Sequence, residues 1–177
     1  GYEKIMQGLS GYWKNNQWDA LDCPLYKNEK NIKKHSIKFK AALNPKIINE
    51  LKYYFFKRLT NSEINLATVY SNASALNRLQ DFILRFYSDI GSIIDISYEK
   101  FSMHYKTYLL EHGKSNLTIK GYLQLYNRIY AFYLDWYDQR KETEKDIWDV
   151  RKLSIEYNNS GYGYTINFTS VPMPFRN

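Results

Sequence analysis

The feature that most constrains the fold of this chain is a series of four segments in which apolar residues recur at helical spacing. The segments lie at about 45–59, 66–87, 98–112 and 118–140 and are separated by short connections. The second segment shows the pattern at greatest length, with a stripe formed by Val69, Ala73, Leu76, Leu79, Ile83 and Phe86. Four amphipathic helices with short connections pack into a compact bundle, so the sequence predicts a mainly α fold built on a four-helix bundle.

Residues typical of helix ends support these boundaries. Asn44 followed by Pro45 is typical of an N-cap and a first helical position, and Ser97 and Thr118 are expected to cap the third and fourth helices. Gly113 is expected to end the third helix, because glycine readily adopts the left-handed backbone conformation found there.

The chain on either side of the bundle is expected to be irregular or extended. Ile37–Lys40 and Ile166–Thr169 alternate apolar and polar residues with the period of a strand and share an Ile-x-Phe-polar pattern. We expect them to pair as a short β ribbon, which is stable only when it packs against the helices. The predicted organisation is an irregular or extended arm at 1–43, a helical domain at 44–145, and a linker with the start of a further domain at 146–177.

Positive charge is concentrated in one stretch. The whole chain has a formal net charge of +7, whereas residues 27–58 alone carry +8, so the remainder sums to −1. The basic residues of this stretch are Lys27, Lys30, Lys33, Lys34, Lys38, Lys40, Lys46, Lys52, Lys57 and Arg58. Such a concentration favours a polyanionic partner such as nucleic acid, although a solvated charged surface gives the same pattern.

Aromatic residues make up 18% of the chain, and 18 of them are tyrosines. Tyrosine buries a large ring while keeping a hydroxyl for a polar partner, which suits the rim of a wet interface. This composition favours a binding surface slightly over a plain core.

Several kinds of site are excluded because the sequence lacks the residues that they require. Cys23 is the only cysteine, so the chain can form neither an internal disulfide nor a zinc site made of thiolates. The three histidines, His35, His104 and His112, do not occur in His-x-x-His or His-x-x-Arg spacing. The sequence also lacks a phosphate-binding loop, a nucleophile elbow and a dinucleotide fingerprint. We therefore expect no catalytic site, no metal and no cofactor in this chain.

The sequence also bears on the compartment. It contains no run of about 18 apolar residues, and its start is unlike a signal peptide. We expect a protein of the reducing cytoplasm that does not enter a membrane.

Several strings resemble a known family of DNA-recombining proteins. Asn65–Ile83 is similar to the second helix, and Asn116–Phe132 to the fourth, of the core-binding domain of phage-integrase-like tyrosine recombinases. Leu51–Leu59, Asp146–Leu153 and Tyr164–Thr169 resemble the large transposase branch that bacterial mobile elements encode.

The resemblance covers about residues 37–171 and leaves 1–30 as an extra arm without a counterpart. It implies a core-binding domain of the SAM-like fold that grips one face of duplex DNA, while a catalytic domain grips the other. The family's catalytic arginine, lysine, His-x-x-Arg and nucleophilic tyrosine would lie beyond Asn177. It further implies a bacterial protein that acts in site-specific recombination and integration of a mobile element.

The resemblance and the charge pattern together nominate residues that contact double-stranded DNA. In similar domains the second and fourth helices approach the major groove, and the start of the fourth lies near phosphates. The expected DNA-binding residues are Lys52, Lys57, Arg58, Thr68, Asn72, Asn77, Arg78, Thr118, Lys120, Gln124, Asn127 and Arg128. Arginine and lysine pair with phosphates, and asparagine and glutamine can read adenine edges. Asn72 and Asn77 also fit plain surface positions, and Thr118 also fits an N-cap.

Two functions remain as hypotheses. The first is a sequence-specific DNA-binding part of a tyrosine recombinase or transposase, with self-association on DNA allowed and the catalytic domain absent from this chain. The alternative is a helical protein–protein interaction module with a tyrosine-rich surface. The salt dependence of binding distinguishes the two hypotheses, because binding through phosphates weakens steeply with ionic strength whereas binding through an aromatic protein interface does not.

Overall fold

The computed structural model describes residues 2–24, 34–59, 66–139, 153–157 and 164–168 of the chain. The elements in chain order are α1 (Tyr2–Lys14), β1 (Gln17–Asp19), the 3-10 turn η1 (Ala20–Asp22), β2 (Ser36–Lys38), α2 (Pro45–Leu59), α3 (Leu66–Tyr70), α4 (Ala73–Phe86), α5 (Tyr98–Glu111), α6 (Asn116–Asp138), β3 (Leu153–Tyr157) and β4 (Tyr164–Phe168). The described part of the chain is mainly helical, and its strands form small antiparallel ribbons. The predicted fold class, a helical bundle with a small ribbon, is therefore confirmed.

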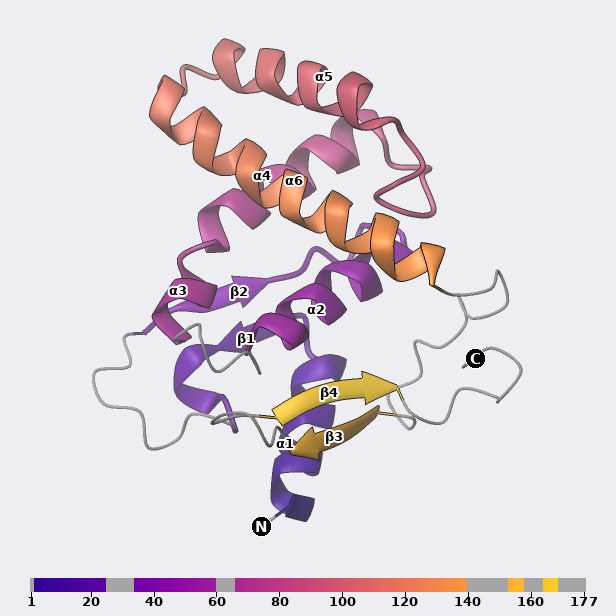
Figure 1. Ribbon diagram of the computed structural model, residues 1–177. Helices are drawn as coiled ribbons and strands as arrows, with labels where there is room; N and C mark the ends of the chain where they lie inside the picture. Colours follow the sequence, from indigo (N-terminus) through magenta and orange to yellow (C-terminus); the bar gives the residue numbers. More distant parts are fainter. Residues whose placement is uncertain (1, 25–33, 60–65, 140–152, 158–163, 169–177) are drawn as a thin grey trace.

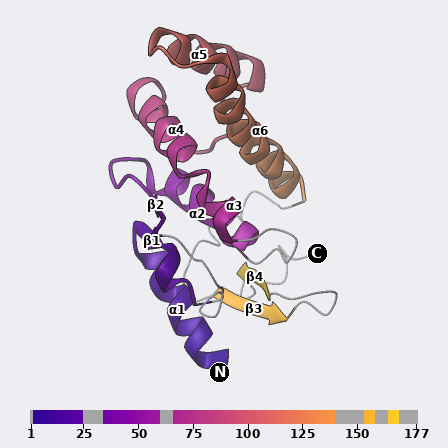
Figure 2. The ribbon, with the colours of Figure 1, turned by 90° about the vertical axis from the view of Figure 1, so that its left-hand side faces the viewer.

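The helices are stacked in layers along the length of the molecule (Figure 1). α5 and α6 form a hairpin at one end, and α6 packs against α4 and α2. β2 lies against α4, while β4 lies beside α2. α1 lies at the end opposite α5, next to β3 (Figure 2). Among the described residues, no helix is both long enough and apolar enough to cross a bilayer.

The helices begin and end where side chains or a glycine satisfy the free backbone groups of a helix end. The Asn44 side-chain oxygen accepts a hydrogen bond from the Lys46 backbone N–H at 2.9 Å, which confirms it as the cap of α2. Ser97 caps α5 as predicted, and Gly113 follows that helix with a φ of +70°. The predicted cap of α6 is wrong, because Ser115 rather than Thr118 accepts the hydrogen bond, from the Thr118 N–H. The Gly113 turn is so tight that α6 begins only three residues later.

The second predicted helix is divided into α3 and α4. The break occurs at Ser71 and Asn72, whose side chains bind carbonyls of the preceding turn. The Ser71 hydroxyl donates to the Thr68 carbonyl at 2.6 Å, and the Asn72 amide donates to the Thr68 and Val69 carbonyls at 3.3 and 3.4 Å. Side chains of this kind compete with the helical hydrogen bonds of the backbone, and the chain turns a corner here.

The predicted ribbon is formed with other partners. Ile37 in β2 pairs with Trp18 in β1, and Ile166 in β4 pairs with Ile155 in β3. The expected pairing of Ile37–Lys40 with Ile166–Thr169 is therefore wrong. Each strand has a nearer partner in sequence, which costs less entropy to bring together than a partner across the whole bundle. Predicted features at 140–152 and 158–163 lie outside the described residues.

The first residues of the chain are not irregular as expected. α1 buries Leu9, Tyr12 and Trp13, which recur at helical spacing on one side of the helix. Trp13 packs on Phe56 of α2 with ring centroids 5.2 Å apart, and the Tyr12 hydroxyl lies 3.1 Å from that of Tyr70. This helix is therefore part of the main core.

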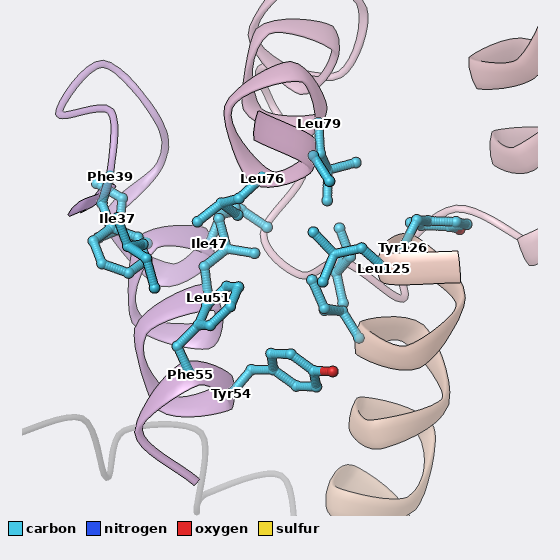
Figure 3. Packing of buried hydrophobic residues seen from close by; sticks show 14 of the residues in the cluster. Ile37, Phe39, Ile47, Leu51, Tyr54, Phe55, Leu76, Leu79, Leu125 and Tyr126 are labelled. Atoms are coloured by element: carbon cyan, nitrogen blue, oxygen red, sulfur yellow. The ribbon is translucent and has the colours of Figure 1, made fainter. Parts of the chain in front are cut away.

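One hydrophobic core extends through the described chain. Figure 3 shows Ile37 and Phe39 near β2 meeting Leu51 and Phe55 of α2, with side chains of α4 and α6 on the other side of α2. Trp18 is fully buried and stacks on Phe56 with centroids 4.7 Å apart. Burial of each such side chain stabilises the fold by about 1.5–3 kcal/mol. Residues before and after position 44 thus depend on the same core.

The tyrosines whose burial is described lie in or against this core rather than on a surface. Of those whose burial is described, nine are buried, four are half-buried and none is exposed. Some of their hydroxyls bind internal groups: Tyr133 donates to the Glu50 carbonyl, and the Tyr87 hydroxyl lies 2.8 Å from His104 Nδ1. The described residues thus give no support to the hypothesis of a tyrosine-rich binding surface.

Candidate nucleic-acid interface

A polar surface of the described chain lies along the first half of α6. Its exposed residues Lys120, Gln124, Asn127 and Arg128 recur every three or four positions, which places them on the side of the helix opposite its buried stripe. We call these four residues the α6 polar face. No acidic residue occurs from 114 to 134, so the face carries positive charge without a local counter-ion.

Two predicted residues, Asn77 and Arg78, belong to α4, which packs against α6. Asn77 is exposed and Arg78 is half-buried. A hydrogen bond with Tyr108 raises the pKa of Arg78, and the neighbouring Tyr122 of α6 acts in the same direction. The nearby acid Asp81 forms an ion pair with Lys40, which partly offsets its charge near Arg78. Arg78 is therefore a permanently charged group held by a tyrosine of α5.

Three predicted residues of α2 have different environments. Lys52 is only 5% exposed, and its ammonium donates to the Trp13 carbonyl at 2.5 Å. Burial also lowers the pKa of Lys52 to about 8. Lys57 and Arg58 are half-buried, each over the tyrosine four residues before it at 5.8 Å from the ring centre. In this arrangement Lys52 cannot reach a phosphate, so we leave it out of the candidate interface.

The remaining predicted residues have local structural roles. Thr68 is exposed, and its carbonyl receives the side chains that end α3. Asn72 is one of those side chains. Thr118 lies in the first turn of α6, where its hydroxyl accepts a hydrogen bond from the Ser115 hydroxyl at 3.0 Å. These residues do not join the α6 polar face.

The basic stretch does not form a single surface. Lys34, Lys38 and Lys46 are exposed, whereas Lys40 is paired and Lys52 is buried. Lys27, Lys30 and Lys33 lie outside the described residues. The basic residues at 27–58, which were the strongest sequence signal for a polyanionic partner, thus lie in several different environments. The α6 polar face is the better candidate for a DNA-binding surface.

Two structural features were missed in the sequence. One is the start of α6, where Ser115 follows two residues after a helix-ending glycine, a spacing that could have identified it. The other is the buried Glu50, whose carboxylate accepts hydrogen bonds from Ser92 and Tyr137 at 2.7 Å and from the Ile93 N–H at 2.8 Å. No sequence signal marks Glu50, because its partners come from distant parts of the chain. The described residues contain no group of acids, histidines or cysteines arranged to hold a metal.

Similarity searches add a separate line of evidence. The chain is 30% identical over 186 aligned positions to transposase B from transposon Tn554 of Staphylococcus aureus, strains Mu50 and N315. Transposase B from transposon PsiTn554 of the same species is also 30% identical. Each alignment covers 90% of this chain but only 29% of the relative. No family model and no solved structure matches the chain.

Proposed function

We propose that this chain, a homologue of part of a mobile-element transposase, is the DNA-binding segment of a transposase of the tyrosine recombinase type. It binds double-stranded DNA at the element ends or at the target site in site-specific recombination and integration. Strand cleavage is assigned to another part of a longer parent protein, since the relatives are more than three times as long as the aligned segment.

The observation that carries this proposal is the acid-free α6 polar face. Lys120 and Arg128 are eight residues apart, about 12 Å along the helix, so two phosphates can be contacted from one element. Gln124 and Asn127 lie between them and carry amides that can donate and accept at base edges. Cations flanking amides fit a contact in which phosphates position the protein and bases give specificity.

The test is duplex affinity as a function of salt for the wild type, Lys120→Ala and Arg128→Ala. Each replacement should weaken binding to all duplexes alike and lower the salt slope by about 0.9 for each lost phosphate contact. Lys14→Ala is the matched control, because Lys14 is an exposed lysine of α1, and α1 lies at the end of the molecule opposite α5 (Figure 2). Equal affinity and equal slope in all four proteins would refute the assignment of α6 to DNA.

A second test concerns cleavage. Incubation of the chain with a suicide duplex carrying the element ends should yield a non-covalent complex only. A phosphotyrosyl adduct would show that the nucleophile lies within this chain, and the division between binding and cleavage would then be wrong.

A further inference from the structure

α5 has apolar side chains on two opposite sides. Phe101, Tyr105 and Leu109 are fully buried against α4 and α6. On the outer side, Met103 is 71% exposed and Leu110 is 50% exposed. They are seven residues apart, close to two full turns, and so are nearly aligned about 10 Å apart. Both views show α5 at the outer edge of the molecule with no labelled element beyond it (Figures 1 and 2).

Opposite charges flank this apolar pair along one edge. Lys100 precedes it and Glu111 follows it, both exposed and about three turns apart on the same edge of the helix. Within the part of the chain that the structure describes, neither Lys100 nor Glu111 forms an ion pair. The Thr107 hydroxyl between them donates to the Met103 carbonyl at 3.1 Å and so is satisfied within α5. We call Lys100, Met103, Lys106, Thr107, Leu110 and Glu111 the outer α5 face.

We propose that the outer α5 face binds the same face of a second copy of this chain through an antiparallel pair of α5 helices. A two-fold axis crossing near Lys106 sets Met103 opposite Leu110 of the partner subunit. The same axis sets Lys100 opposite Glu111 of the partner subunit. In both pairs the two residues lie at the same position along the helix axes to within about one residue, roughly 1.5 Å. Each contact occurs twice, as an isologous interface requires.

The charge pattern favours this occupant over DNA. The face carries Lys100 and Lys106 against Glu111, with Glu99 exposed beside it, and is therefore neutral rather than cationic. A neutral face with an apolar centre does not attract a polyanion. The antiparallel pair matches Lys100 with Glu111 of the partner subunit on both sides of the axis.

Lys106 limits the strength of the association. It lies on the other edge of the face and near the two-fold axis, so it approaches Lys106 of the partner subunit. This repulsion and the small apolar area give a weak and reversible dimer. The surface is separate from the α6 polar face, and the inference holds whether or not the chain binds DNA.

The experiment is sedimentation of the chain without DNA over a range of concentrations up to millimolar. The wild type should show a reversible monomer–dimer equilibrium. Met103→Glu should shift it to monomer, whereas Leu134→Glu, which changes a 48% exposed leucine of α6, should leave it unchanged. A wild type that stays monomeric throughout would overturn the proposal.

Charge exchange tests the antiparallel geometry itself. Lys100→Glu and Glu111→Lys should each weaken association about tenfold, because two attractive pairs become repulsive. The double variant restores both pairs with reversed sign and should associate within about threefold of the wild type. Lys106→Gln should associate more tightly than the wild type. A double variant no stronger than the single ones, with all variants folded by circular dichroism, would exclude this pairing.

Discussion

Replacing Glu50 by glutamine should change how the stability of the protein depends on pH. The Glu50 side chain is 1% exposed and lies where α2, the loop after α4 and the last turns of α6 meet. Its carboxylate accepts hydrogen bonds from Ser92, Ile93 and Tyr137, which favour the ionised form. Burial acts in the opposite direction, and the charge of Asp95 adds to it.

Burial is the larger effect and raises the pKa of Glu50 from its ordinary 4.5 to about 7. The neighbouring Tyr133 and Tyr137 do not titrate in this range, because burial and the Glu50 carboxylate raise their pKa values far above the usual one. A carboxyl whose pKa is raised on folding contributes stability below its unfolded pKa and loses that contribution as the pH rises through the folded value. The difference between 4.5 and about 7 corresponds to about 3 kcal/mol.

The free energy of unfolding of the wild type should therefore fall relative to that of Glu50→Gln between about pH 4.5 and about pH 8. Glutamine resembles the protonated carboxyl in shape and charge, so the two proteins should differ little at the acidic end of this range. At the alkaline end the variant should be the more stable by up to about 3 kcal/mol. Urea unfolding followed by circular dichroism at several pH values measures this difference.

Glu111→Gln is the matched control, because Glu111 is exposed at the end of α5. Its stability relative to the wild type should not depend on pH across this range. If the difference in the free energy of unfolding between the wild type and Glu50→Gln is also independent of pH, the three hydrogen bonds fully offset the effect of burial on the pKa of Glu50. The reasoning from desolvation would then be wrong.

Four further replacements test other parts of the structure. Gly113→Ala should lower stability by about 1 kcal/mol, because φ at this position is +70°, and an equal or higher melting temperature would contradict it. Ser115→Ala removes the cap of α6 and should cost about 1 kcal/mol in urea unfolding, whereas Thr118→Val should cost less if Ser115 is the cap. Lys52→Met should leave DNA affinity and its salt slope unchanged, because the Lys52 ammonium is bound to the Trp13 carbonyl; a reduced slope would mean that Lys52 does reach a phosphate.

The parts of the fold that were predictable depend on local signals. The boundaries of α2 follow from Asn44 and Pro45, and the start of α5 follows from Ser97, because each signal acts on backbone groups within a few residues. Thr118 was misassigned because two hydroxyl residues lie within one turn, and the choice between them depends on the Gly113 turn. The exposed residues of α6 were also predictable, since helical spacing alone separates them from the buried stripe.

α1 was missed because its sequence is unfavourable for an isolated helix. It contains Gly8 and Gly11, and glycine costs about 1 kcal/mol relative to alanine in a helix. At Gly8 the reason is tertiary, since a Cβ there would lie 2.8 Å from the Pro24 side chain. The close approach of Pro24 requires the glycine, and packing of Trp13 on Phe56 stabilises the helix.

The environments of Glu50 and Lys52 could not be predicted from charge. Residues 50–56 of α2 are buried on all sides, so this helix runs through the centre of the structure rather than along its surface. Charged residues in such a helix need internal partners, and theirs come from the loop at 92–93, α6 and α1. Spacing in the sequence indicates where a side chain points but not whether another element covers it.

The stacking of Trp18 on Phe56 ties the beginning of the chain to the helices that follow it. A polypeptide that started at residue 44 would leave Phe55 and Phe56 facing water and would lack the Trp13 carbonyl that binds Lys52. The first 43 residues and the helices after them should therefore melt in a single cooperative transition. For protein engineering, the smallest stable fragment begins before Leu9, and a truncation at the start of α2 would yield an aggregation-prone product.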